Sequence, residues 1–179
     1  MACIKKLSVD ITYDCANLGF LGGTGEIDEA IVINSSDIST ISETGGVGTI
    51  TMLTGKEGYV VNSVNNSVTY QEAIKANDTV PAAEDQSVVI KVMSSMDSTA
   101  YRLALSSLLK GNFRVALKSK SGNYYLAGAF CGLEASDMAT DSSTGGISTV
   151  TLKTPEASTG DMLVTLTKAA YDGLKTPKV

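Results

Sequence analysis

The chain has 179 residues, no histidine and no tryptophan, and a formal net charge of −5. Its length is typical of one domain that buries roughly 70% of the surface of the unfolded chain. Without histidine the chain lacks the commonest general base and the commonest metal ligand, so we expect neither an enzyme nor a metal site. No apolar run approaches the roughly 20 residues that cross a bilayer, so we expect no membrane partner.

The three cysteines, Cys3, Cys15 and Cys131, lie too far apart in sequence for the usual spacing of zinc ligands. Lys5 and Lys6 are followed by no apolar segment, so we expect no secretory signal and a chain made in the cytoplasm. Thiols stay reduced in that compartment, and free cysteines are usually buried. We therefore expect free thiols and no cofactor.

The first half of the chain predicts short strands between glycine-rich or polar turns. Residues 3–13 alternate moderately and predict a strand or an extended arm. Residues 26–33 predict a second strand, although Glu29 interrupts its apolar set for no reason that simple alternation supplies. Further strands are expected at 49–53, 59–64 and 68–74, with polar loops at 34–48 and 75–85.

Residues 86–130 carry the clearest pattern of the chain. Residues 86–93 are rich in β-branched side chains and predict a strand. An apolar stripe at the helical period then predicts a helix over about residues 97–110, with Asp97 or Ser98 as its N-cap and Gly111 at its end. Two strands, at 112–118 and 124–130, are expected to form a hairpin around the turn 119–123.

Beyond residue 130 the sequence predicts further strands and a final helix. Residues 134–146 predict a loop rich in Ser, Thr, Asp and Gly, followed by strands at 147–153 and 162–167 and a short helix at 167–174. Regularly spaced short strands with glycine-rich turns are typical of a β-sandwich or a closed, barrel-like sheet. We therefore predict a mainly β fold, a single domain over 1–179 with two packed sheets and one flanking α-helix at about 97–110.

Charge is unevenly distributed along the chain. Residues 1–90 hold twelve acidic and four basic side chains, whereas residues 91–120 hold six basic side chains and one acidic one. A basic segment on an acidic body is consistent with nucleic-acid binding, and also with a subunit whose positive face meets the negative face of an identical neighbour. The basic residues lack interleaved exposed aromatic side chains, and the overall sign disfavours DNA, so the sequence favours self-association.

The order of elements from residue 86 onward resembles that of tail tube proteins of bacterial viruses, especially those that infect Bacteroidetes hosts. The resemblance rests on a strand, the helix MDSTAYRLALSSLLKG, the hairpin NFRVALKSKSGNYYLAG and the segment CGLEAS. It extends back to the strand at 67–73 and forward through the glycine turn and strand at 143–153, and residues 1–5 with Asp14 and Cys15 are similar as well. No single motif is a signature, and the order of elements carries the resemblance.

The resemblance implies hexameric rings, joined through paired sheets of neighbouring subunits, that stack into a hollow tube in the virion tail. The implied partners are further copies of the chain, other tail proteins and the DNA that passes through the tube. Carboxylates along the lumen would repel DNA phosphates and let the genome slide. Asp28, Glu29 and Glu72, on predicted strands, are our candidates for lumen residues.

Contacts between subunits have two kinds of candidate residue. The polar segment 34–48 predicts an inter-ring arm with Ile38 and Ile41 as its apolar contacts, and an ordinary surface loop is the alternative. The basic segment contributes cations that would face outward or meet acidic neighbours. These are Arg102, Arg114, Lys118 and Lys120.

Two other functions fit a mainly β plan. A different virion component, such as a capsid decoration protein or a tail-completion or connector ring, would close as a trimer or a single ring instead of stacking without limit. A carbohydrate-binding module is disfavoured, because sugar stacking usually needs exposed aromatic rings and the chain has no tryptophan and three phenylalanines. The sequence therefore favours a structural virion protein without catalytic residues.

Overall fold

The computed structural model describes residue 10 and residues 26–62, 67–75, 83–92, 99–144, 146–156, 158 and 160–176. The strand or arm predicted at 3–13 lies, apart from residue 10, outside the described residues, as do Cys3 and Cys15. The other predicted elements fall largely within the described part of the chain.

Eleven strands and two short α-helices make up the described fold. The first strands are β1 (Ile27–Asn34), β2 (Ile38–Thr44), β3 (Val47–Met52), β4 (Tyr59–Asn62), β5 (Val68–Lys75) and β6 (Ala83–Val92). Helix α1 (Thr99–Leu108) is followed by β7 (Asn112–Ser119), β8 (Tyr124–Ala127), β9 (Leu133–Asp141), β10 (Ile147–Lys153), β11 (Val164–Leu166) and helix α2 (Lys168–Asp172). Three 3-10 turns are η1 (Ser35–Asp37), η2 (Ser142–Thr144) and η3 (Gly173–Lys175). The predicted mainly β class is confirmed.

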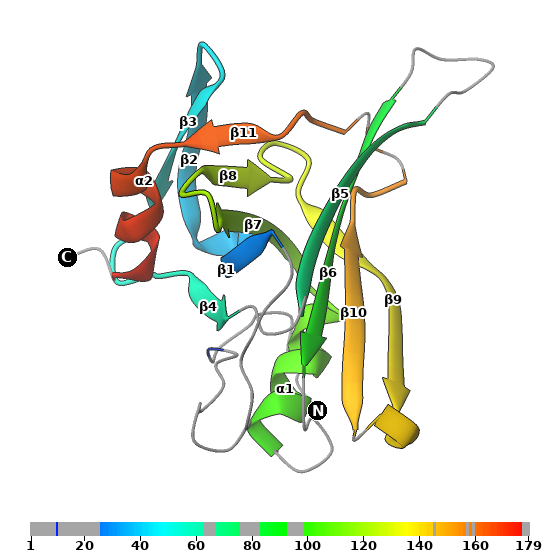
Figure 1. Ribbon diagram of the computed structural model, residues 1–179. Coiled ribbons are helices and arrows are strands. Elements are labelled where there is room, and N and C mark those ends of the chain that lie inside the picture. Colours follow the sequence, from blue (N-terminus) through cyan, green and yellow to red (C-terminus); the bar gives the residue numbers. More distant parts are fainter. Residues whose placement is uncertain are drawn as a thin grey trace.

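The described strands form one mixed sheet, in which all pairs are antiparallel except β11 with β3. The main path runs β2-β3-β11-β8-β7-β9-β10-β6-β5, and β1 pairs with both β7 and β4. A bend lies at β7, because β9 pairs with it only through Leu133 and Glu134 and then continues along β10. The sheet thereby folds into a four-stranded layer (β9, β10, β6 and β5) and a seven-stranded layer that contains the other strands (Figure 1).

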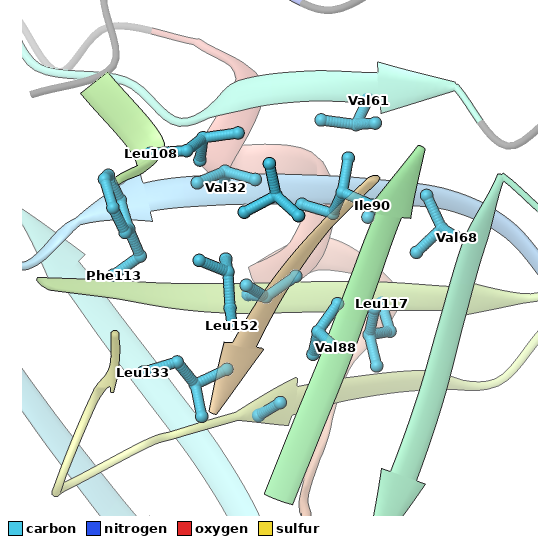
Figure 2. Close-up of a cluster of buried hydrophobic side chains, with 14 of the residues drawn as sticks. Val32, Val61, Val68, Val88, Ile90, Leu108, Phe113, Leu117, Leu133 and Leu152 are labelled. Atoms are coloured by element: carbon cyan, nitrogen blue, oxygen red, sulfur yellow. The ribbon is translucent and has the colours of Figure 1, made fainter. Parts of the chain in front are cut away.

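The main core fills the space between the two layers. Val88 and Ile90 of β6 face Leu117 of β7 across it, and all three are fully buried (Figure 2). Helix α1 closes one end of this space with the buried side chains of Leu105 and Leu108. Each fully buried aliphatic side chain stabilises the fold by about 1.5–3 kcal/mol, so the contact between layers is the main source of stability.

A second apolar cluster lies on the other face of the seven-stranded layer. Successive side chains of a strand point to opposite faces, so Val32 of β1 enters the main core while Ile31 enters the second cluster. Helix α2 and η3 cover this cluster with the buried side chains of Tyr171 and Leu174. The hydroxyl of Thr167 caps α2 by accepting the N–H of Ala170 at 3.2 Å.

Two segments predicted as polar loops are strands, so that part of the prediction is wrong. Residues 34–48 contain η1, β2 and the start of β3, and residues 134–146 contain most of β9 with η2. Both strands are mostly exposed, so neither shows the alternation that a half-buried strand leaves in the sequence. Main-chain pairing with β3 and with β10 forms them in spite of their polar side chains.

The predicted hairpin after α1 has a shorter second strand than expected. β8 ends at Ala127 rather than at residue 130, because Gly128 adopts a positive φ of 65°. The chain then turns toward β9, and the N–H of Gly132 donates to the carbonyl of Gly128 at 3.0 Å. Strand β6, in contrast, is longer than predicted, because it begins at Ala83 and not at residue 86.

Candidate functional site

A β-bulge explains the acidic interruption of β1. The register with β7 shifts between Ile27 and Glu29, so Asp28 is an extra residue in β1. Because of this shift Ile27 faces the main core, whereas Glu29 lies on the opposite face together with Ile31. Alternation read from the sequence assumes an unbroken strand and therefore missed the change of face.

Glu29, a predicted lumen residue, is bound by two side chains of the C-terminal helical turns. The Tyr171 hydroxyl donates to Glu29 Oε1 at 3.0 Å, and the Lys175 ammonium forms an ion pair with the same oxygen. Lys175 Nζ also lies 5.3 Å from the centre of the Tyr171 ring. Burial and then the charge of Glu29 raise the pKa of Tyr171. Glu29 thus joins β1 to α2 and η3 within one chain.

The other two predicted lumen residues lie on different layers. Asp28, on β1, pairs with Lys118 of β7 at 2.5 Å. Glu72 is exposed on β5, and its carboxylate accepts the N–H of Leu163 at 3.1 Å. Burial raises the pKa of the neighbouring Tyr70, and the charge of Glu72 raises it further. The structure therefore does not bring the three predicted carboxylates together.

The segment predicted as an inter-ring arm is part of a β-hairpin. Ile38 and Ile41 are half-buried on β2 and pack against the second apolar cluster of their own chain. Gly45 and Gly46, both with positive φ, form the turn between β2 and β3. The hairpin tip projects beyond the rest of its layer, and Val47 beside the turn is 42% exposed (Figure 1).

Arg114 is held in a network inside the chain. Its Nη1 donates to Asn112 Oδ1 at 3.0 Å and to the hydroxyl of Ser35, while Nε donates to the carbonyl of Ala129 at 3.3 Å. Its Nη2 donates to the carbonyl of Phe130 at 3.1 Å. Burial lowers the pKa of Arg114, against the opposing effect of nearby acidic groups. The guanidinium fastens β7 to η1 and to the turn after β8.

The remaining basic candidates differ in exposure. Arg102 is exposed on α1, and Lys120 is exposed in the turn after β7. Lys118 is half-buried, and its hydrogen bond to Asp28 raises its pKa. Arg102 and Lys120 are therefore the predicted contact cations that lie at the surface.

The four-stranded layer has an edge on each side that no described strand covers, a feature that the sequence did not reveal. β5 pairs with β6 on one side, and β9 beyond Glu134 pairs with β10 on one side. Residues 71–74 of β5 and most of β9 are exposed. The backbone N–H and C=O groups on such an edge can pair with a strand from another chain.

The outer face of the four-stranded layer, which points away from the core, is polar. Thr149 and Thr151 of β10 lie on it and alternate with the buried Val150. The strand register assigns to the same face the carboxylates of Asp85, Glu134, Asp137 and Asp141 and the ammonium groups of Lys91 and Lys153. Lys153 and Asp85 form an ion pair at 2.9 Å. Carboxylates thus outnumber cations among the described side chains of this face.

Buried polar contacts fix the end of the molecule at which β8 turns into β9. The Gln86 side chain is fully buried, its Oε1 accepts the N–H of Gly128 at 2.6 Å, and its Nε2 donates to the carbonyl of Asp161 at 2.7 Å. The Asp161 carboxylate accepts the N–H groups of Phe130 at 2.6 Å and of Cys131 at 3.0 Å. The four-stranded layer, the turn after β8 and the connection from β10 to β11 are joined there.

The described residues hold no cluster of three or more Cys, Asp and Glu side chains that could bind a metal ion. None of the helices in the described part of the chain is long and apolar enough to cross a membrane. An apolar cavity of about 490 Å³ opens between the layers, where Val68, Tyr70 and Tyr125 contribute to its wall. A scan against protein-family models, a search of curated proteins and a search of solved structures found no match to this chain.

Proposed function

We propose that this protein is the subunit of a bacteriophage tail tube, a structural virion protein whose stacked rings form a conduit for the genome. Two observations support the proposal. The order of elements in residues 67–153 resembles that of tail tube proteins, and the same residues supply β5, β6, β9 and β10. These strands form an antiparallel layer with an uncovered edge on both sides within the described fold. The uncovered edges carry the proposal, because a protein that works alone normally protects them.

The strand directions allow such a layer to continue from one copy into the next. Neighbouring strands alternate in direction, so β5 and β9 at the two edges run in opposite directions. A copy rotated about an axis roughly parallel to the strands would bring its β5 beside β9 as another antiparallel pair. Repeating this heterologous contact closes a ring. A hexamer would hold about two dozen such strands, more than the porin barrels that already leave an aqueous channel.

In such a ring the outer face of the four-stranded layer would line the lumen, because the core covers its other face. Asp137 and Asp141 on this face would repel DNA phosphates, because the four carboxylates of the face outnumber its two described cations, Lys91 and Lys153, and Lys153 is paired with Asp85. Asp28 and Glu29 belong to the seven-stranded layer, and Glu72 alternates with the outer residues of β5. Asp137 and Asp141 therefore replace the three earlier candidates as the proposed lumen carboxylates.

The structure also reduces the set of residues that we propose for contacts outside the ring edge. Arg102 and Lys120 remain candidate contact residues at the surface. Arg114 and Lys118 have partners within their own chain, as do Ile38 and Ile41. The exposed tip of the β2–β3 hairpin is the projecting arm that the proposal retains.

Engineered cysteines test the ring edge. In a background with the native cysteines replaced by serine, one cysteine replaces Gln71 or Ala73 of β5 and another replaces Asp137 or Ala139 of β9. Three strand spacings, about 14 Å, separate β5 from β9, so a disulfide cannot form within one copy. We expect oxidation of the concentrated protein to give a ladder of covalent oligomers that stops at the ring number on a non-reducing gel.

The single-cysteine variants are the matched controls, because each can form a dimer and no ladder. A ladder that stops at three copies would favour a decoration protein instead of a tube. A ladder with a fixed end but no filaments would favour a connector or completion ring. If no pair of positions gives more than dimers, the proposed pairing of β5 with β9 is wrong.

A further inference from the structure

One end of the molecule exposes three large apolar side chains beside carboxylates. Ile74 is 74% exposed, Met162 is 68% exposed and Phe130 is 51% exposed. Together with the neighbouring carboxylates they form what we name the acidic apolar patch, which comprises Ile74, Phe130, Met162, Glu72, Glu84 and Asp161. Large exposed apolar side chains that gather in one place mark a surface that binds a partner.

The connection from β10 to β11 holds the acidic apolar patch together. The Asp161 carboxylate accepts the N–H of Phe130 at 2.6 Å, and the N–H of Leu163 donates to Glu72 at 3.1 Å. Met162 lies between these two anchored residues. The patch is therefore a fixed feature of the fold, with its apolar centre and its negative charge in a defined arrangement.

The opposite end carries a groove between α1 and β9, which we name the α1–β9 groove. It has a volume of about 360 Å³ and is lined by Arg102, Leu105, Ser106, Leu109, Met138, Thr140 and Ser148. Leu109 and Met138 in this groove are each 39% exposed. Arg102 carries the only charge among the described lining residues, and the exposed Lys110 follows Leu109. The groove is therefore apolar with a positive rim.

The strand register shows how far apart the two surfaces lie. Met138 of the groove pairs with Val150, which pairs in turn with Ile90 of β6. Glu84 of the patch lies six residues earlier on the same strand, about 20 Å away at the usual rise per residue. Figure 1 shows the same separation, with α1 at one end of the molecule and the far ends of β5 and β6 at the other.

We propose that the acidic apolar patch of one copy docks into the α1–β9 groove of the next copy, and that this contact stacks one ring on another. The two surfaces are apolar at their centres and opposite in charge, so they are complementary to each other and not to themselves. A contact between unlike ends continues without limit along an axis. The inference rests on the proposed tail tube and names the surfaces that join its rings.

Charge reversal in a double-mutant cycle tests this contact. Arg102→Glu places a carboxylate against the acidic apolar patch, and Met162→Lys places a cation against the α1–β9 groove. We expect each single variant to raise the protein concentration needed for filaments by at least about tenfold, and the double variant to recover most of the loss. Lys56→Glu, the same reversal at an exposed cation between β3 and β4 and outside both surfaces, is the control and should leave filament assembly unchanged.

Ring formation and ring stacking are measured by separate assays, the covalent ladder and filament assembly. Each variant also carries the cysteine pair at Gln71 and Ala139, and we expect the covalent ladder to persist while filaments are lost. Unchanged filaments in both single variants would overturn the stacking contact and leave the ring intact. The stacking contact would also be overturned if a variant lost both the ladder and the filaments while its urea midpoint matched that of the parent protein. In that case the acidic apolar patch and the α1–β9 groove would act in ring closure. A parent protein with neither ladder nor filaments would refute the tail tube itself.

Discussion

Gln86 is a buried amide with both polar atoms in use, and its replacement makes a sharp test of the fold. Gln86→Leu keeps most of the volume but leaves the Gly128 N–H and the Asp161 carbonyl without their partner. A buried polar group without a partner costs about 1–3 kcal/mol. We expect urea denaturation to show a loss of about 2–5 kcal/mol in the free energy of unfolding. Gln71→Leu on exposed β5 should change it by less than about 0.5 kcal/mol, and equal losses would contradict the role of Gln86.

Two glycines with nearly the same backbone angle separate conformational strain from steric contact. Gly55 has a φ of 71° and nothing within 4 Å of an added Cβ, whereas Gly160 has a φ of 72° and its Cβ would lie 1.7 Å from the carbonyl oxygen of Glu84. Gly55→Ala should cost about 1–2 kcal/mol, the usual penalty of a left-handed residue. Gly160→Ala should cost at least about 2 kcal/mol more, because backbone must move. Similar losses in thermal unfolding would show that the close approach is absent.

Tyr171 makes the stability of the fold sensitive to alkaline pH. Burial and the charge of Glu29 raise its pKa above the value of about 10 that it has in the unfolded chain. The pKa of Tyr171 is higher in the folded state, so the protonated hydroxyl stabilises the fold. This contribution to the free energy of unfolding is complete below pH 10 and falls as pH rises further, by about 1.4 kcal/mol at pH 11. We expect Tyr171→Phe to lose less stability than the parent between pH 8 and pH 11, measured by urea unfolding. An equal alkaline loss in both proteins would contradict this assignment.

At the scale of the element, helix α1 offers the same substitution on its buried and exposed faces. Leu108 is fully buried in the main core, whereas Leu103 is 47% exposed. Leu108→Ala should lower the free energy of unfolding by about 2–5 kcal/mol, because it removes buried methyl groups and leaves a cavity. Leu103→Ala should stay within about 0.5 kcal/mol in the monomer. A comparable loss for both variants would mean that α1 does not pack as described.

The elements that the sequence predicted are those whose burial leaves a periodic pattern. Helix α1 and strands such as β7 and β10 bury one face or both, so their apolar residues recur at the helical or strand period. β2 and β9 are formed by main-chain pairing and keep polar, exposed side chains, so their sequences read as loops. The face of Glu29 was missed for a related reason, because the bulge at Asp28 depends on how β1 pairs with β7.

The candidate assembly surfaces were less predictable than the core, because an edge is a property of the whole sheet. β5 was predicted as a strand, but its place at the end of the strand order follows only from the complete topology. Glu72 and Asp161 are far apart in sequence, and two hydrogen bonds place them on one surface: Glu72 accepts the N–H of Leu163, and Asp161 accepts the N–H of Phe130. The uneven charge along the chain predicted self-association, but only the fold shows at which end of the molecule the acidic and the basic side chains lie.

For the whole molecule, the two proposed contacts should respond differently to salt. Stacking joins the positive rim of the α1–β9 groove to the carboxylates of the acidic apolar patch, and salt screens such charges over about 8–10 Å at ordinary ionic strength. The ring edge would be joined by backbone hydrogen bonds, which carry no net charge. We therefore expect sodium chloride at about 0.5 M to shorten filaments in sedimentation assays while the oxidised cysteine ladder keeps its length. A ladder that shortens in parallel with the filaments would contradict this division of roles.

Negative-stain electron microscopy of the purified protein at rising concentration tests the central claim most directly. The proposed tail tube predicts hollow filaments of uniform width with a regular axial repeat, and averaging would give the number of subunits in each ring. Isolated closed rings would support the pairing of β5 with β9 and contradict the stacking contact. Protein that remains monomeric at every concentration would contradict the tail tube.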